Sequence, residues 1–363
     1  MDRPSTSNPS RFVRVLIVPL LETKSLTIGY AAGKASPHVV AHDLNVALDE
    51  GELVCLLGPN GAGKSTLMRT LAGMQPPLGG HALLSGEDVS GMTAQDRAHR
   101  IGVVLTDRVD AGHLDVRTLV GLGRYPYTDW LGRLGPDDLD KVSWAIRVVG
   151  ATELADRPIN ELSDGERQKA MIARALAQDT ELVLLEEPTA FLDLPRRVET
   201  IALLRRLARQ TGKSILVTTH DLDLAVRNAD RIWLMSNSRI EVGVPEALVL
   251  NGAFGRVFER EGILFDRHAG AFTVPTENLT PIVLHGTGLV GAWTTRALER
   301  VGFEVHPPAG PDITDTKVFI EGTEDHPFWR VEQSGHEDTF ESLDSLLGYL
   351  SPSRLDSADR GRT

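Results

Sequence analysis

The chain has 363 residues, which is enough for one large domain and a smaller one. Its 38 Lys and Arg against 50 Asp and Glu give a formal charge of −12, which argues against a nucleic-acid-binding protein because phosphate contacts need a clustered basic face. No stretch approaches the roughly 18 apolar residues of a membrane span, and the single cysteine, Cys55, excludes an internal disulfide.

Two strands are predicted after the N-terminal segment. Residues 1–20, which begin with a Ser-, Pro-, Asn- and Arg-rich stretch, are expected to be flexible. Leu21–Tyr30 and Val39–Leu48 alternate apolar and polar residues, which predicts strands of an antiparallel flap. Tyr30 ends the first strand, either as a strand-end aromatic or as a surface on which an adenine ring stacks. The residues alone leave both interpretations open.

The next stretch fits the phosphate-binding pattern G-x-x-x-x-G-K-[ST]. It lies between an apolar strand, Leu53–Leu57, and a predicted helix, Leu67–Ala72. The residues predicted to bind the phosphates are Gly58, Pro59, Asn60, Gly61, Ala62, Gly63, Lys64, Ser65 and Thr66. Glycines let several backbone N–H groups face one anion, Lys64 adds a full positive charge, and the Ser65 hydroxyl can bind Mg²⁺ between phosphates. The sequence therefore predicts a nucleoside triphosphate site.

A helical insertion is predicted after the next buried strand, Ile101–Leu105. The pattern is helical from about Arg117 to Leu154, with turns at Gly135 and Gly150, and the insertion is placed at about residues 107–162. The insertion separates two groups of nucleotide-binding elements.

The stretch that follows the insertion is Leu162–Lys169. Ser163, with Glu166 three residues later, forms a capping box, so a helix should begin there with Ser163 as its N-cap. Gly165 disfavours a helix but lets the backbone approach a ligand closely. The stretch therefore predicts a place where the backbone approaches a ligand, in addition to the start of a helix.

Two carboxylates end the apolar strand Glu181–Pro188, namely Glu186 and Glu187. Beside a triphosphate, such a pair can hold Mg²⁺ through water and polarise the attacking water. His220 ends a further strand, Ser214–His220, at the position where open α/β sheets place their ligands. The order of these elements favours a phosphate-sensing role for the histidine.

In this order, the phosphate loop, Leu-Ser-Asp-Gly-Glu, Leu-Leu-Glu-Glu-Pro and Thr-Thr-His-Asp resemble the ATP-binding subunits of ABC transporters over residues 21–272. The resemblance implies an α/β fold, the P-loop NTPase nucleotide-binding domain of ABC type with an antiparallel β flap and a helical insertion, binding ATP and Mg²⁺. Gly-Arg-Tyr-Pro-Tyr at Gly123–Tyr127 looks like the subgroup that imports iron chelates (siderophores), haem or cobalamin.

The resemblance also implies roles for single residues. Two ATP molecules would be sandwiched in a head-to-tail homodimer, each between the phosphate loop of one chain and Ser163, Asp164, Gly165 and Glu166 of the other. Tyr30 would stack on adenine, Glu187 would polarise the lytic water, and His220 would contact the γ-phosphate. Asp193 would bridge the dimer. The insertion would dock on an integral membrane permease at the cytoplasmic face of the membrane. The resemblance implies that this permease is a dimer and that a substrate-binding protein delivers cargo to it.

Three positions depart from the family pattern. Thr106 replaces a usual Gln that joins Mg²⁺ and water to the permease interface, and Glu186 replaces a usual Asp. The expected metal-binding residues are therefore Ser65, Glu186 and Thr106. Asp164 and Glu166 add two negative charges near a phosphate, which predicts weaker dimer closure through like-charge repulsion. None of the departures removes Lys64, and a working ATPase is predicted.

Residues 275–352 are expected to form a small α/β accessory domain, and 353–363 a tail. Strands are predicted at Pro281–His285, Lys317–Ile320 and Phe328–Val331, and helices at Ala292–Val301 and Ser342–Leu350. The glycines that match G-x-G-x-x-G are Gly286, Gly288 and Gly291, with Glu304 where a ribose-binding acid would lie. About 85 residues cannot supply both halves of a dinucleotide-binding fold, so a regulatory or interaction domain is expected instead.

The sequence thus predicts a peripheral ATPase subunit of a membrane importer, with no nucleic-acid partner. The alternative is a permease-free soluble ABC-type ATPase that acts as an assembly or regulatory module. A nucleic-acid-acting ABC ATPase is disfavoured because the chain has one phosphate loop and an acidic balance.

Overall fold

The computed structural model describes residues 18–31, 36–105, 114–259, 264–267, 270–273, 280–308 and 314–350. The chain divides into two compact units, Met1–Thr273 and Val274–Thr363, and each is described by itself. Most of the expected N-terminal segment, the tail and Thr106 lie outside the described residues. Within the described part, no helix has the length and apolar character that a bilayer span requires.

A six-stranded sheet forms the centre of the first unit, in the order β11-β10-β4-β9-β8-β7. Its strands are β4 (Leu53–Leu57), β7 (Ile101–Val104), β8 (Leu182–Glu186), β9 (Ser214–Thr218), β10 (Arg231–Ser236) and β11 (Arg239–Gly243). All neighbours pair in parallel except β10 and β11. The parallel strands read as continuous apolar runs because both faces of the sheet are covered.

The two faces of the sheet pack into two separate hydrophobic clusters. Val54 and Leu56 of β4 join α1 (Lys64–Leu71) and the flap, whereas Leu53 and Leu57 join the cluster that contains α5 (Asp164–Ala177) and α6 (Leu194–Thr211). Cys55 also lies in that second cluster and is fully buried. Burial, helped by the negative charge of Asp230, raises the pKa of the Cys55 thiol to about 12.

The flap is an antiparallel sheet, as the sequence predicts, in the order β2-β1-β5-β6 with β3 also paired to β1. Its strands are β1 (Leu21–Tyr30), β2 (His38–Leu44), β3 (Ala47–Leu48), β5 (Gly79–Leu84) and β6 (Glu87–Asp88). The single strand expected at Val39–Leu48 is wrong, since the structure has β2 and β3 there. The break falls at Asn45. Its side chain accepts a hydrogen bond from the amide of Ser25 and donates one to the carbonyl of Asp43, so side-chain bonds replace the regular backbone pairing there.

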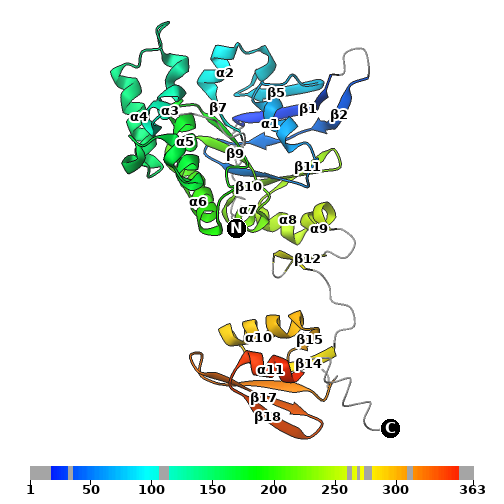
Figure 1. The fold of residues 1–363 in the computed structure, drawn as a ribbon. Coiled ribbons are helices and arrows are strands. Elements are labelled where there is room, and N and C mark those ends of the chain that lie inside the picture. Colours follow the sequence, from blue (N-terminus) through cyan, green and yellow to red (C-terminus); the bar gives the residue numbers. More distant parts are fainter. Residues whose placement is uncertain are drawn as a thin grey trace, which may run out of the picture. The chain divides into compact units, whose positions relative to one another are not determined.

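The helical insertion gathers on the side of the unit away from the flap (Figure 1). Its elements are α3 (Val116–Gly121), η2 (Leu122–Tyr127), α4 (Pro136–Val148), η3 (Thr152–Leu154) and η4 (Ile159–Glu161), followed by α5 (Asp164–Ala177). Gly123 allows η2 to pack directly on α5, because a Cβ there would overlap the carbonyl oxygen of Arg174. Buried Arg124 fixes the contact by donating to Asp138 (2.8 Å) and to the carbonyl of Ala177 (2.9 Å).

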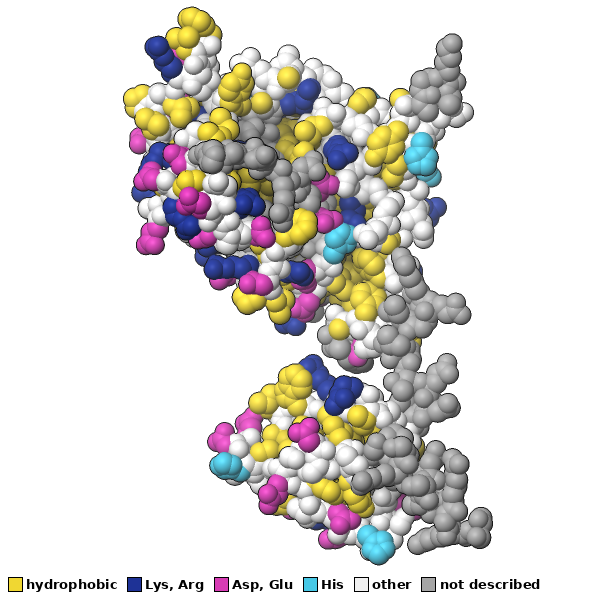
Figure 2. Space-filling model, in the orientation of Figure 1, with side chains coloured by type: hydrophobic (Ala, Val, Ile, Leu, Met, Phe, Trp, Pro, Cys, Tyr) yellow, Lys and Arg dark blue, Asp and Glu magenta, His cyan; other side chains and the backbone are white. Residues whose placement is uncertain are grey.

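The loop between η2 and α4 projects from the insertion (Figure 1). Figure 2 shows hydrophobic side chains and a basic side chain at this projecting end. Tyr125, Trp130 and Leu131 are exposed by 74%, 91% and 48%. Within the described chain, these large apolar side chains keep about half or more of their surface exposed.

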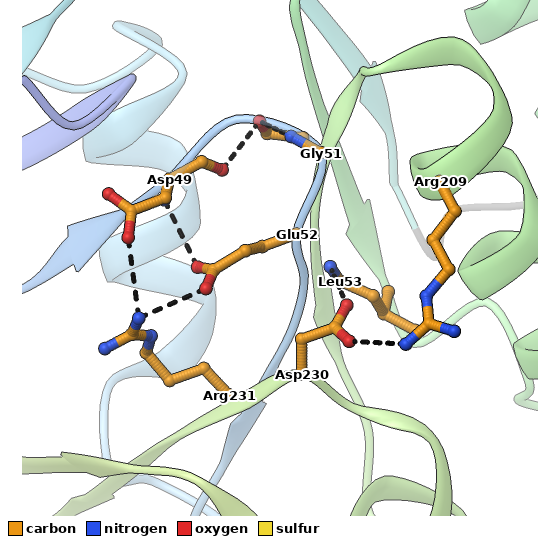
Figure 3. Close-up of polar contacts among 8 residues, drawn as sticks. Asp49, Gly51, Glu52, Leu53, Arg209, Asp230 and Arg231 are labelled. Atoms are coloured by element: carbon orange, nitrogen blue, oxygen red, sulfur yellow. Dashed lines mark hydrogen bonds and ion pairs between the residues drawn. The ribbon is translucent and has the colours of Figure 1, made fainter. Parts of the chain in front are cut away.

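The end of the sheet opposite the phosphate loop is tied by polar contacts (Figure 3). Arg231 reaches Asp49 (3.5 Å) and Glu52 (3.1 Å), just before β4. Asp230 accepts from the amide of Leu53 (3.0 Å) and from Arg209 (3.1 Å). These bonds hold the start of β4 against β10 and α6 (Leu194–Thr211), so they fix the strand that carries the loop.

The remaining elements of the first unit cover its edges. They are η1 (Val89–Gly91), α2 (Ala94–Arg100), α7 (Leu222–Asn228), α8 (Pro245–Leu250), α9 (Ala253–Phe258), β12 (Leu264–Asp266) and β13 (Ala271–Thr273). Phe254 of α9 is fully buried, and its ring contacts that of Phe265 of β12 in a tilted arrangement, with centroids 5.4 Å apart. This contact anchors the end of the unit to its core.

In its described residues, the second unit is a five-stranded sheet in the order β15-β14-β16-β17-β18, with two helices. Its elements are β14 (Thr280–His285), α10 (Gly288–Arg300), β15 (Phe303–His306), β16 (Lys317–Gly322), β17 (Pro327–Gln333), β18 (His336–Phe340) and α11 (Leu343–Leu350). The start predicted for the first helix, Ala292, is wrong, because α10 already begins at Gly288.

Packing accounts for the glycine pattern of the second unit. A Cβ at Gly286 would press on Ile320, and one at Gly291 would lie 3.0 Å from the carbonyl oxygen of Gly286. Glu304 pairs with Pro281, at the end of β14 away from the glycine turn. In a dinucleotide site the acid lies near the turn, so this geometry gives no support to such a site.

Candidate active site

The phosphate loop runs from the end of β4 to the start of α1, as the sequence predicts. Gly58 and Gly63 have φ of 156° and 104°, which L side chains rarely adopt. A Cβ at Gly58 would overlap the carbonyl oxygen of Met235, and one at Gly63 would overlap the side chain of Val40. The loop therefore lies so close to β10 and β2 that only glycine fits at both positions.

Lys64 lies inside this loop and is only 8% exposed. Its Nζ donates to the carbonyl oxygens of Gly58 (2.8 Å) and Pro59 (3.2 Å). Burial lowers the pKa of Lys64, and the negative charge of Glu187 opposes that shift. The ammonium is thus held in the loop, within the field of the Glu187 carboxylate, one residue past β8 (Leu182–Glu186). Ser65, next along the helix, is exposed.

Tyr30 lies beside the loop, at the end of β1. Its hydroxyl is 3.0 Å from Oγ1 of Thr66, and its ring is half exposed, at 47%. The ring stacks loosely on His38, with centroids 6.5 Å apart. A flat aromatic surface therefore borders the phosphate loop.

Glu187 and His220 meet at the carboxyl ends of β8 and β9. The Nε2 atom of His220 lies 2.6 Å from Oε1 of Glu187, and the backbone amide of Glu187 donates to Oγ1 of Thr218 (2.9 Å). Glu186 ends β8 and pairs with Thr218 in the ladder. An open pocket of about 390 Å³ is lined by Glu187, His220, Arg197 and neighbouring residues. Sequence reasoning missed Thr218, although a hydroxyl at the end of an otherwise apolar strand is a visible signal.

The predicted capping box at the start of α5 is confirmed. Ser163 accepts from the amide of Glu166 (3.3 Å), and Glu166 accepts from the amide (2.9 Å) and hydroxyl (2.8 Å) of Ser163. Backbone and side-chain hydrogen bonds from Ser163, with smaller effects of Arg157 and Arg196, lower the pKa of Glu166. Glu166 is therefore ionised at neutral pH.

Arginines of the same chain surround the two acids of this segment. Arg157 lies 3.4 Å from Glu166, and Arg167 lies 3.5 Å from Asp164. A Cβ at Gly165 would touch Arg196 of α6, at 3.4 Å. The negative charge that the sequence adds here is thus offset locally, which the sequence analysis did not foresee.

Asp193 caps α6 by accepting from the amide of Arg196 (3.0 Å). Tyr30 contacts the phosphate-loop helix through Thr66, and Glu187 is close enough to Lys64 to influence its pKa. The contacts of Ser163–Glu166 described above run instead to arginines of the insertion, α5 and α6.

A phosphate loop between a parallel strand and a helix, with a Glu and His pair at the neighbouring strand ends, defines a P-loop nucleotide hydrolase. Residues 41–190 match the family model described as ABC transporter, and residues 279–351 match the model for the iron ABC transporter C-terminal domain. The chain belongs to the ATP-binding proteins of ABC transporters and is an ATPase of that type. The family resemblance of its motifs is thereby confirmed.

Relatives of this family match over most of their length. An uncharacterized ABC transporter ATP-binding protein of Methanocaldococcus jannaschii is 37% identical, over 79% of this chain and 98% of its own. The ferric enterobactin transport ATP-binding protein of Escherichia coli is 35% identical, over 69% and 90%. The dimeric structure of the bacterial ABC transporter cassette MJ0796 is 25% identical, with a TM-score of 0.53, over 61% and 96%.

Proposed function

We propose that the chain is the ATP-hydrolysing subunit of an importer for an iron chelate, haem or cobalamin. The observation that carries the hydrolytic role is the Glu187 and His220 pair, 2.6 Å apart and close enough to Lys64 to affect its pKa. The iron-type C-terminal match and the enterobactin-transport relative favour an iron chelate as cargo. The alternative is a permease-free ABC-type ATPase.

In the proposed mechanism, Lys64 exchanges its bonds to Gly58 and Pro59 for bonds to the β- and γ-phosphates of ATP, while the amides of the loop bind the same oxygens. The ring of Tyr30 stacks on the adenine. These residues fix the phosphates before any bond changes.

Ser65 and Glu186 offer hydroxyl and carboxylate oxygens, which are the donors that Mg²⁺ prefers, so the residues present fit this ion. The third proposed ligand, Thr106, lies outside the described residues. When bound with ATP, Mg²⁺ neutralises phosphate charge.

The Glu187 carboxylate takes a proton from the attacking water, whose oxygen bonds to the γ-phosphorus as the bond to the bridging oxygen of ADP breaks. His220 donates a hydrogen bond to the γ-phosphate and holds Glu187 in place. Stabilisation of the negative charge on the phosphates by Lys64 supplies most of the remaining rate acceleration.

We place the second half of each ATP site on another copy of the chain. Ser163 and Asp164 are exposed at the start of α5, a 14-residue helix whose N-terminus carries partial positive charge. Ser163, Asp164, Gly165 and Glu166 would face the γ-phosphate of the partner, with Asp193 at the interface. This gives a head-to-tail homodimer.

The partner proposed for the insertion is an integral membrane permease, which a substrate-binding protein would load, at the cytoplasmic face of the membrane. The exposed apolar side chains of Tyr125, Trp130 and Leu131 suit such a contact. Mild-detergent co-purification of tagged Glu187→Gln protein with ATP and Mg²⁺ tests the proposal. A polytopic membrane protein in about equal amount would support it, whereas a bare homodimer would favour the permease-free alternative.

We expect Trp130→Ala to reduce recovery of the permease in that co-purification by about tenfold, the effect of losing one interface anchor. ATP hydrolysis by the isolated protein should stay within about twofold of the wild type, because the Trp130 side chain is 91% exposed and contributes little to the fold. The matched control is Trp293→Ala, which removes an exposed tryptophan from the second unit. Equal loss with both variants would contradict a specific role of the insertion.

We also expect Arg157→Gln, which removes the ion pair with Glu166, to raise the ATP concentration needed for dimerisation by about fivefold, the scale of one exposed ion pair. The reason is that Glu166 then faces the phosphate with less compensation. Adding Glu166→Gln, which keeps the capping geometry, should reverse the effect. Light scattering in the Glu187→Gln background measures it, with the surface variant Arg227→Gln as control. If the effects of the two substitutions on dimerisation simply add in the double variant, the arginine does not compensate the charge of Glu166.

A further inference from the structure

The backbone of Glu187 has an unusual conformation. Its φ is +47°, in the left-handed region that non-glycine residues rarely adopt. The next residue is Pro188, which pushes the residue before it toward extended conformations. Two local preferences therefore oppose the observed geometry, and other contacts must maintain it.

Thr218 provides one such contact. The β8–β9 ladder ends at the pair Glu186 and Thr218, so the amide of Glu187 lies just past the last regular pairing. Oγ1 of Thr218 accepts from this amide at 2.9 Å, and Thr218 is only 1% exposed. Water therefore has little access to replace the hydroxyl.

A second contact holds the other end of the residue. His220, two positions after Thr218, binds the Glu187 carboxylate through Nε2. The segment Thr218–His220 thus contacts both the backbone and the side chain of Glu187. The direction of the carboxylate depends on both contacts, because a change of φ at Glu187 would move its whole side chain.

We propose that Thr218 is a positioning residue for hydrolysis, which locks Glu187 in the left-handed conformation that aims its carboxylate at the lytic water. This rests on the proposed role of Glu187. A purely structural role would be filled as well by valine, which has the same shape and suits a buried strand whose preceding residues are Ile215, Leu216 and Val217.

Steady-state ATP hydrolysis of the full chain, with nucleotide binding measured separately, tests the proposal. Thr218→Val keeps the shape and removes the hydroxyl, and Thr218→Ser keeps the hydroxyl. We expect Thr218→Val to lower kcat by about 10- to 100-fold, the scale of a misplaced catalytic group, with ATP affinity within twofold. Thr218→Ser should restore most of kcat.

The fold control is Thr180→Val, which removes another buried hydroxyl of the first unit, one that donates to the carbonyl of Leu182 and not to Glu187. It should reproduce any loss of thermal stability without the loss of kcat. An unchanged kcat in Thr218→Val, or an equal loss in Thr180→Val, would overturn the proposal.

Glu187→Gln, assayed in parallel, separates this inference from the proposed function. If Glu187→Gln abolishes turnover and Thr218→Val does not lower it, only the role of Thr218 fails. If Glu187→Gln turns over ATP normally, both fail, because no catalytic carboxylate is then left to position.

Discussion

Glu187→Gln should lower the rate of ATP hydrolysis by about 100-fold or more, the range that general-base catalysis supplies. ATP binding should persist, because the amide has the same shape as the carboxylate and Lys64 remains in the loop. The side-chain oxygen that His220 contacts is also retained. Single-turnover phosphate release, together with binding of a fluorescent ATP analogue, measures the two effects separately.

The matched control is Glu153→Gln, at an exposed position of the insertion. It should hydrolyse ATP at the wild-type rate. Turnover of Glu187→Gln within about twofold of the wild type would remove Glu187 from the mechanism.

The other large effect is expected at the phosphate loop, where Lys64→Met should weaken ATP binding by about 10- to 150-fold. This is the range for losing one charge-assisted hydrogen bond of about 1.5–3 kcal/mol. The methionine has similar length and suits a site that is only 8% exposed, but it brings no charge to the phosphates. Equilibrium binding of the nucleotide measures the loss.

Because the methionine leaves the carbonyls of Gly58 and Pro59 without their present donor, thermal unfolding should be followed in the same samples. Lys24→Met, at an exposed position of the flap, serves as control. ATP binding that is unchanged in Lys64→Met would contradict the assignment of the loop.

Features that depend on neighbouring residues could be predicted from the sequence. The bounds of β1 and β4 agree with expectation because alternation and apolar runs are local signals. The turn at Gly58 and the capping box at Ser163 are likewise set by residues a few positions apart. The family motifs then gave the order of the elements.

Features that depend on distant residues could not be predicted. The contacts of Thr218 with Glu187 and of Tyr30 with Thr66 span 31 and 36 positions, and they form only when the strands meet. The start of α10 was missed because three glycines favour a turn, whereas two of them, Gly288 and Gly291, lie within the helix. β18 was missed because its residues, His336–Phe340, are mostly polar.

The burial of Cys55 has a practical consequence for labelling. A thiol with a pKa of about 12 stays protonated at neutral pH, so it reacts poorly with maleimides and iodoacetamides. It is also the only cysteine in the 363 residues. The wild-type chain is therefore a suitable background for introducing a single reactive cysteine that carries a spin label or fluorophore. One exposed residue of each unit replaced by cysteine and labelled would report the distance between the units during the ATP cycle, with Cys55 left in place.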